Sequence, residues 1–300
     1  MGMSKARAIF LIPKWMRNVM SYCGVSLWSL VYRKKALAFC ESQKGEYDEI
    51  ADYLRKYKRL NYFQYEFAEE YKKKDIKVFK DENGFCYVLR NGKKLYGKDY
   101  WKKGDMQGYF CGLFLEQDAR SPHAYFPGDS ASERKACLQG GSLADIGAAE
   151  GIFALDVIDD VKEVYLFECD EEWIAPLRRT FGPWKDKVHF VKKYVGKEDN
   201  GNVISLDTFF RDKELTHVKA DIEGAEEDML DGSREVFKNK VKASWLCAYH
   251  KPNALEQIKE RLDRVGFDYE INRGYIFFPN GIKLVEPYYR RGALYSKRKR

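Results

Sequence analysis

The sequence lacks the short motifs that hold a structural metal or a disulfide framework. Its seven cysteines form no C-x-x-C pair and no cluster with the four histidines. Scattered cysteines argue against a zinc site and fit a reducing compartment. We therefore expect a cytoplasmic protein stabilised by its hydrophobic core, for which 45% hydrophobic and 15% aromatic residues in a chain of 300 are ample.

Long apolar runs are also absent. The uncharged stretch over residues 18–32 is shorter than the roughly 20 residues that a membrane-spanning helix needs. The basic residues 33–35 follow it directly and precede the only cleavage-like site, residues 36–38, which disfavours a signal peptide. Two interpretations remain for residues 1–35: a helix packed on the domain, or an interfacial amphipathic anchor at the inner face of a membrane.

Acidic residues are missing from both ends of the chain. Residues 1–35 hold seven basic residues, residues 290–300 hold six, and neither stretch holds an acid. The formal net charge is +7, so the rest of the chain is net acidic. This pattern argues against a nucleic-acid partner and predicts peripheral membrane contact through the basic termini.

The first half of the chain carries no repeat and no low-complexity linker. Residues 47–74 have helical spacing, and residues 75–97 contain two Asn-Gly turns between β-rich segments, which predicts a three-stranded meander. Residues 108–126 indicate a helix that ends before Pro122. We expect residues 1–138 to form an N-terminal helical extension and a small α+β cap.

From residue 139 the pattern alternates between strand and helix. This alternation predicts an α/β domain over residues 139–280, with a parallel sheet covered on both faces. Segments 268–272 and 275–278 are expected to close as an antiparallel hairpin at residues 273–274, and residues 281–300 to form a basic tail. The expected strands are 143–146, 163–168, 188–191, 217–221 and 243–249, and the expected helices begin near 151, 171, 225 and 254.

The stretch LADIGAAEGIFALDVI, residues 143–158, reads as a strand, a loop of small residues and a helix start. Such a unit binds nucleotide-like ligands at a helix N-terminus. The G-x-G-x-x-G pattern of NAD sites and the G-K-[ST] of P-loops are both missing. Asp145 instead leads the loop, which suits a cationic ligand such as S-adenosylmethionine (SAM), and Glu168 ends the next strand where it could accept the ribose hydroxyls.

Five segments carry a family resemblance: DIGAAEG (145–151), VYLFECD (164–170), SLDTFF (205–210), VKADIEGAEEDMLDG (218–232) and YHKP (249–252). With these segments the chain resembles the FkbM family of SAM-dependent methyltransferases over residues 110–280. The resemblance implies a Rossmann-like class I methyltransferase fold with a mostly parallel seven-stranded sheet. It also implies O-methylation of a sugar, as in a surface glycan, or of a secondary metabolite.

Ligands of open α/β sheets bind outside the carboxyl ends of the strands. This rule puts His189 and His217 on the wrong edge and makes His250, which follows a strand directly, the first choice for a base. His123 reads more often as a turn residue, but it would lie near the pocket if the cap folds over it. No metal is expected because no third well-placed carboxylate is evident beside Asp221 and Glu223. We expect catalysis by His250, Asp221 and Glu223, and cofactor contacts from Asp145, Gly147, Ala148, Glu150, Gly151, Glu168, Cys169, Tyr194 and Asp221.

Three other function classes stay open at this point. A nucleic-acid methyltransferase would usually carry an Asn/Asp-Pro-Pro-aromatic motif where this chain has residues 221–224, DIEG. An NAD oxidoreductase is disfavoured by the missing glycine fingerprint. A non-catalytic scaffold at a membrane surface, or a methyltransferase acting on a peptide, is compatible with the same segments.

Overall fold

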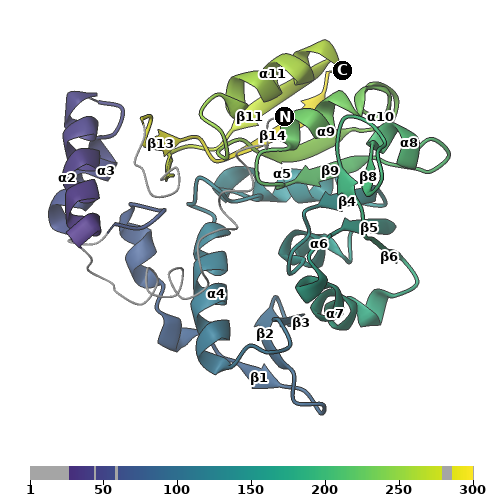
Figure 1. The fold of residues 1–300 in the computed structure, drawn as a ribbon, viewed down its shortest axis with the longest axis horizontal. Coiled ribbons are helices and arrows are strands. Elements are labelled where there is room, and N and C mark those ends of the chain that lie inside the picture. The colour runs from purple at the N-terminus through teal and green to yellow at the C-terminus, as the bar shows by residue number, and fades with distance from the viewer. Residues whose placement is uncertain (1–26, 44, 58–59, 279–285, 300) are drawn as a thin grey trace. The chain divides into compact units, whose positions relative to one another are not determined.

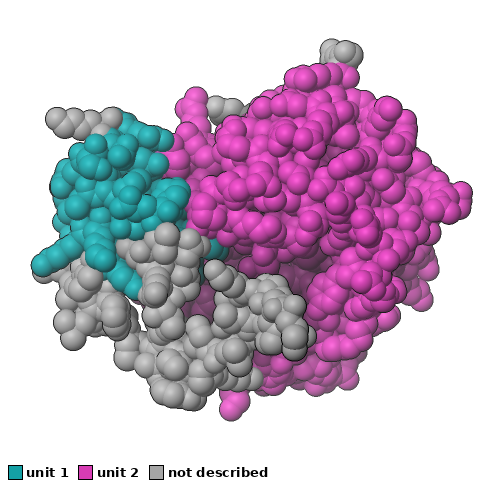
Figure 2. Space-filling model, turned by 45° about the horizontal axis from the view of Figure 1, so that its top comes forward, with its two compact units in different colours: residues 1–70, 276–289 teal, residues 71–275, 290–300 magenta. Residues whose placement is uncertain are grey.

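The computed structural model describes residues 27–43, 45–57, 60–278 and 286–299, shown as the coloured ribbon in Figure 1. The chain divides into two compact units, coloured separately in Figure 2. Unit 1 comprises residues 1–70 and 276–289, and unit 2 comprises residues 71–275 and 290–300.

Unit 1 is built from short helices and aromatic side chains. Its described elements are helices α2 (Leu27–Ser42) and α3 (Asp48–Lys56), the 3-10 helix η2 (Glu66–Glu70) and strand β12 (Ile276–Phe277), which pairs with β13 (Tyr289–Arg290). The single helix expected over 47–74 is wrong. Tyr57 already has extended backbone, with ψ of 133°, so α3 ends there.

The proposed membrane anchor falls mostly on residues 1–26, which lie outside the described residues. Among the helices that the structure describes, none is long and apolar enough to cross a membrane.

Unit 2 begins with the predicted meander, which the structure confirms as β1 (Phe79–Lys80), β2 (Cys86–Arg90) and β3 (Lys93–Tyr96). Helix α4 (Lys103–Glu116) follows. Its first turn is capped because the Asp105 carboxylate accepts the backbone N–H of Lys102 at 3.0 Å. The helix ends at Glu116, well before the Pro122 that was expected to stop it.

A seven-stranded sheet forms the centre of unit 2, in the order β11-β14-β10-β9-β4-β5-β6. The five strands from β10 to β6 are parallel, and β14 runs antiparallel to both of its neighbours. This order confirms the expected class I methyltransferase-like fold. The strands are β4 (Ser142–Ile146), β5 (Glu163–Phe167), β6 (Val188–Val191), β9 (His217–Ala220), β10 (Ala243–Cys247), β11 (Phe267–Ile271) and β14 (Ala293–Arg298).

Helices cover both faces of this sheet (Figure 1). Along β4, Leu143 packs into the core that contains α4, α6 and α7, while Ala144 packs into the core that contains α8 to α11. Successive residues of a strand point to opposite faces, so the all-buried strands reflect two cores rather than one. The helices are α5 (Ala131–Ala136), α6 (Ile152–Val157), α7 (Glu171–Thr180), α8 (Leu206–Phe209), α9 (Glu226–Asp231), α10 (Arg234–Asn239) and α11 (Ala254–Arg264).

The remaining elements of unit 2 are short. They are the 3-10 helices η3 (Lys73–Asp75), η4 (Gly128–Ser130) and η5 (Gly182–Trp184), and the strands β7 (Tyr194–Val195) and β8 (Val203–Ile204), which pair with each other.

The expected C-terminal hairpin is wrong in its pairing. Strand β11 pairs with β14, so that Ile271 lies opposite Leu294, and the segment after residues 273–274 does not return along it. Residues 293–298 were expected in a basic tail, but they form the strand between β10 and β11. Their apolar residues Ala293, Leu294 and Tyr295 are buried between the two cores, which a charge count could not reveal.

Candidate functional site

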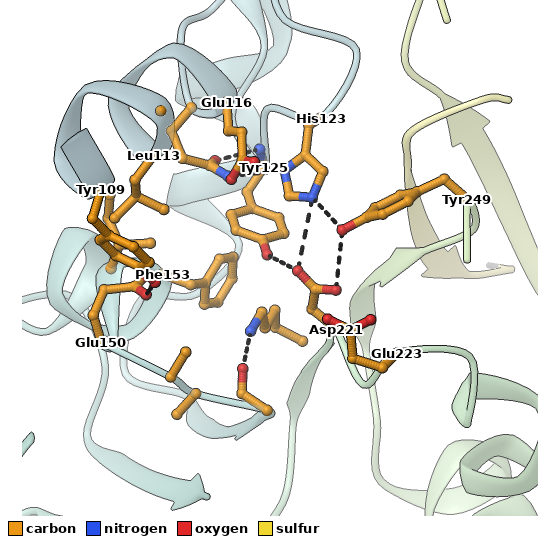
Figure 3. Close-up of a pocket in the computed structure, with 17 residues that line it drawn as sticks. Tyr109, Leu113, Glu116, His123, Tyr125, Glu150, Phe153, Asp221, Glu223 and Tyr249 are labelled. Atoms are coloured by element: carbon orange, nitrogen blue, oxygen red, sulfur yellow. Dashed lines mark hydrogen bonds and ion pairs between the residues drawn. The ribbon is translucent and has the colours of Figure 1, made fainter. Parts of the chain in front are cut away.

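A cavity of about 350 Å³ opens where the carboxyl ends of β4 and β9 meet (Figure 3). The strand order of the sheet reverses between these two strands, and this is where open α/β sheets bind their ligands. The volume falls in the usual range of small-molecule sites. The cavity is lined by Tyr109, Gly112, Leu113, Glu116, Gln117, His123, Tyr125, Gly147, Ala148, Ala149, Glu150, Ile152, Phe153, Lys219, Asp221, Glu223 and Tyr249.

The small residues of the loop after β4 are explained first by the protein itself. Gly147 has φ of +71°, and a Cβ there would lie 2.1 Å from the carbonyl oxygen of Asp221. Gly151 has φ of +87°, and a Cβ there would lie 2.6 Å from the Phe181 ring. Both positions therefore need glycine because β9 and α7 pack against the loop. Between the two glycines, Ala148 to Glu150 face the cavity.

Asp145 leads this loop but does not line the cavity. Its side chain is fully buried, and one carboxylate oxygen lies 2.9 Å from the Nζ of Lys219. Lys219 also donates to the carbonyl of Gly147 at 2.8 Å. Burial alone would lower the pKa of Lys219, but Asp145 and Asp221 outweigh it and hold that pKa above its usual value. The pair thus fixes the loop to β9 with a charged ammonium at the cavity floor.

Asp221 is the polar centre of the cavity. It follows β9, and Tyr125 donates to Oδ2 at 3.2 Å while Tyr249 donates to Oδ1 at 3.3 Å. Figure 3 shows both rings and His123 converging on this carboxylate. Burial would raise the pKa of Asp221, but His250, His123 and Lys219 outweigh it and leave the pKa lowered. Asp221 is therefore an oriented, ionised acceptor.

His250 lies behind Asp221 and does not line the cavity. Its Nε2 is 3.4 Å from Asp221 Oδ1, and its Nδ1 is 3.0 Å from Glu226 Oε1. Burial would lower the pKa of His250, but Glu226 and Asp221 outweigh it and raise that pKa. Glu223 stands at the mouth, 92% exposed, with φ of +56° that few non-glycine residues adopt.

Glu226 is the third carboxylate that the sequence did not place. Asp221, Glu226 and His250 could offer three metal-ligand atoms within 4.8 Å of one another. The two ring nitrogens of His250, however, face different carboxylates, which is the arrangement of an ion-paired imidazolium. A hydrogen bond from Ile222 N–H to Glu226 at 2.9 Å fixes this carboxylate further.

His123 is held in one tautomer by its neighbours. Tyr125 N–H donates to Oε1 of Gln117 at 3.1 Å, so the Gln117 amide nitrogen faces Nδ1 of His123, also at 3.1 Å. Nδ1 must then accept, which leaves the proton on Nε2, 3.1 Å from the hydroxyl of Tyr249. Burial lowers the pKa of His123 to about 4, so the ring is neutral and acts as a donor.

The segment carrying His123 and Tyr125 is fixed to the sheet by backbone contacts. Asn272 donates to the carbonyl of Ala124 at 2.6 Å, and the indole of Trp245 donates to that of Tyr125 at 3.0 Å. These contacts come from β10 and from the residue after β11, so the sheet itself positions a segment that precedes it in the chain.

Two glutamates complete the acidic lining. Glu150 accepts a hydrogen bond from the hydroxyl of Tyr109. The carboxylate of Glu116, the last residue of α4, makes no hydrogen bond or ion pair with any residue in the described part of the chain. Burial, together with Asp221 and Glu150, raises the pKa of Glu116 to about 8.

Besides Asp145 and Gly151, three more of the expected cofactor contacts lie outside the cavity lining. Glu168 follows β5, where its carboxylate accepts the backbone N–H groups of Ala149 at 2.8 Å, Cys169 at 2.7 Å and Asp170 at 2.6 Å. A carboxylate has about four acceptor positions, so about one remains for a hydroxyl donor. Cys169 is half-buried beside it, and Tyr194 is 59% exposed in β7. His189 and His217 lie in β6 and β9 and do not line the cavity either.

Sequence patterns alone did not indicate that α4 and Tyr249 contribute side chains to the cavity. Tyr109, Leu113 and Glu116 are spaced by four and three residues, which places them on one helix face. A carboxylate at the end of that otherwise apolar stripe was a usable signal. Tyr249 stands next to His250, but only the fold shows that its side chain reaches Asp221.

No protein-family model matches the sequence. No curated protein matches it either.

Solved structures give weak matches to the fold. A methyltransferase FkbM from Methylobacillus flagellatus KT is 16% identical, with a TM-score of 0.41 over 64% of this chain and 54% of that chain. Trm5b from Pyrococcus abyssi is 14% identical, with a TM-score of 0.41 over 71% of this chain and 55% of that chain. This chain thus spans about half the length of either structure.

A proposed methyltransferase from Streptococcus mutans, solved in complex with SAH, is 11% identical, with a TM-score of 0.37 over 55% of this chain and 92% of that chain. The fold is assigned from the strand order of the sheet. The proposed reaction is derived from the residues that line the cavity.

Proposed function

We propose that the protein is a SAM-dependent methyltransferase that methylates a hydroxyl group, with the cavity beside Asp221 as its active site. One observation carries the proposal: a cavity at the strand reversal of a class I methyltransferase-like sheet is lined by both carboxylates and aromatic rings. Aromatic faces and carboxylates attract cations. These side chains therefore fit the sulfonium and ammonium groups of SAM, whereas the carboxylates would repel the pyrophosphate of NAD.

When bound, SAM would supply a methyl group on a positively charged sulfur. The loop residues Ala148 to Glu150 would hold it on one side, and Glu168, with about one acceptor position left, would take a ribose hydroxyl. We keep Asp145, Gly147 and Gly151 in the site for a different reason. Asp145 pairs with Lys219, and the two glycines allow the close packing that shapes the loop.

Asp221 is our choice for the group that accepts the proton of the acceptor hydroxyl. Its carboxylate lines the cavity and is fixed by Tyr125 and Tyr249. Positioning of two reactants contributes about 7–11 kcal/mol when the geometry is good, and a base adds roughly 10²–10⁴-fold. The low pKa of Asp221 makes it a weak base, so orientation is the larger contribution here.

His250 and Glu223 then take supporting roles. Both nitrogens of His250 face carboxylates, so we assign it to holding Asp221 ionised and oriented rather than to proton abstraction. Glu223, at the exposed mouth, would meet the acceptor as it enters. Tyr194 and Cys169 are retained as proposed cofactor contacts, although residues 192–196 depart from the small residues that many members of the resembled family carry there.

The acceptor we propose is a neutral hydroxyl compound, a sugar of a surface glycan or a secondary metabolite. The family resemblance supports this choice, and the acidic lining disfavours phosphorylated acceptors. Peripheral contact of the basic N-terminal residues 1–35 with a membrane would bring the enzyme to a lipid-linked glycan.

Calorimetric titration tests the proposal with SAM and NAD as ligands. We expect SAM to bind and NAD not to bind. Glu168→Gln should weaken SAM binding about 10- to 100-fold, since one charge-assisted hydrogen bond contributes about 1.5–3 kcal/mol. If the folded wild-type protein bound neither ligand, the methyltransferase proposal would fail. Glu256→Gln, an exposed substitution on α11, is the matched control.

A further inference from the structure

The three inner carboxylates of the cavity, Glu116, Glu150 and Asp221, differ in the hydrogen bonds that they receive. Tyr109 donates to Glu150, and Tyr125 and Tyr249 donate to Asp221. Glu116 receives no such donor from any described residue. It nevertheless lines the same cavity and lies close enough to the other two carboxylates for each to raise its pKa.

Without a ligand, the carboxylates that line the cavity lack a positive charge to balance them. Lys219 is the single cation among the residues that line it, and its ammonium is already engaged by Asp145 and by the Gly147 carbonyl. Ionising several neighbouring carboxylates costs free energy unless a positive charge lies among them. Glu116 also ends α4, a helix of 14 residues whose C-terminal end carries a partial negative charge.

We infer that Glu116 is the counter-ion of the methionine end of SAM, which carries the sulfonium and ammonium groups. Binding of these charges displaces a proton from Glu116 to solvent. The inference rests on the proposed function. No bond other than the carboxyl O–H changes: the acid loses its proton to the buffer, and the carboxylate then faces the cation.

The groups that face Glu116 determine how binding depends on pH. They are Tyr109 on α4, Glu150 after β4, Asp221 after β9, and Tyr249 after β10. Glu116 titrates near pH 8 in the free protein, so at pH 7 most molecules carry its proton. A cation prefers the deprotonated form. SAM affinity should therefore rise up to about tenfold per pH unit between pH 6 and 7.5, and level off above 8.

The test is calorimetry of SAM binding at pH 7 in two buffers of different ionisation enthalpy, which counts the protons released. We expect wild type to release nearly one proton for each SAM bound. Glu116→Gln should bind SAM with no release from this site and with a flat pH dependence, whereas the exposed variant Glu256→Gln should behave as wild type. SAH carries the same amino group as SAM but a neutral sulfur, so it should release fewer protons.

Each outcome has a separate meaning. If wild type binds SAM without releasing a proton, or if Glu116→Gln releases as many protons as wild type, the inference is wrong and the methyltransferase proposal stands. If the folded wild type does not bind SAM, the proposed function itself fails. Should Glu116→Gln misfold, the wild-type pH profile still decides: a rise in SAM affinity with a midpoint near 8 supports Glu116, and an affinity that does not change between pH 6 and 8 contradicts the inference.

Discussion

The two walls of the cavity use their polar groups differently. In the sheet wall, residues 145–153 and 219–223, the lysine is engaged within the wall: Asp145 pairs with Lys219, and Lys219 donates to the Gly147 carbonyl. The helix wall, residues 109–125, supplies tyrosine donors to Glu150 and Asp221, and it presents Glu116, which receives no such donor from the described residues. The comparison indicates that the ion pair of the sheet wall maintains the shape of the site, whereas Glu116 of the helix wall is the carboxylate left for a ligand.

The largest effect is expected from a substitution that breaks the ion pair of the sheet wall. Lys219→Met leaves Asp145 buried without its partner, which typically costs about 3–5 kcal/mol. Urea unfolding should show this loss. The double variant Lys219→Met with Asp145→Asn should recover part of it, because the uncompensated charge is gone. Equal stabilities for the single and double variants would contradict the role assigned to the pair.

A second substitution tests the packing of the same wall. Gly147→Ala forces a Cβ onto the Asp221 carbonyl and strains a left-handed residue, at an expected cost of about 2–4 kcal/mol. Gly140→Ala is the matched control, since Gly140 has φ of +69° and nothing within 4 Å of its added Cβ. The control should lose only about 1–2 kcal/mol in thermal unfolding. Similar losses in both variants would mean that the close approach at Gly147 does not matter.

A third prediction concerns His250, which connects Asp221 to Glu226. Its pKa is raised on folding, so its protonated ring adds stability that is present below about pH 6.5 and lost as pH rises through the folded pKa. The difference in melting temperature between wild type and His250→Gln should therefore be larger at pH 5.5 than at pH 9. A difference that does not change with pH would argue against an ion-paired imidazolium.

The last prediction concerns the helix wall, and its pH dependence has the opposite sign. Because the pKa of Glu116 is raised to about 8 on folding, wild type loses stability relative to Glu116→Gln as pH rises from about 4.5 to 8. The variant should match or exceed wild type in melting temperature at pH 9 while losing the proton linkage to SAM. A marked loss of stability would place Glu116 among the structural residues and remove the contrast between the walls.

Local sequence patterns identified most of the sheet wall. The apolar strand before the glycine loop and the acid ending β9 can be read from spacing alone, because they are consequences of strand and turn geometry within a few residues. The class of the fold followed from the strand–helix alternation together with the family resemblance. The meander over β1 to β3 followed from its Asn-Gly turns.

What the sequence by itself determined is therefore the α/β architecture, the loop after β4 and the position of Asp221 at a strand end. Only the tertiary structure decided that residues 293–298 enter the sheet, that His250 turns away from the cavity, and that Glu116, His123 and Tyr249 face it. The physical reason is separation along the chain. Tyr125 meets Asp221 across 96 residues, and Asn272 fixes the Ala124 carbonyl across 148, so no local pattern records these contacts.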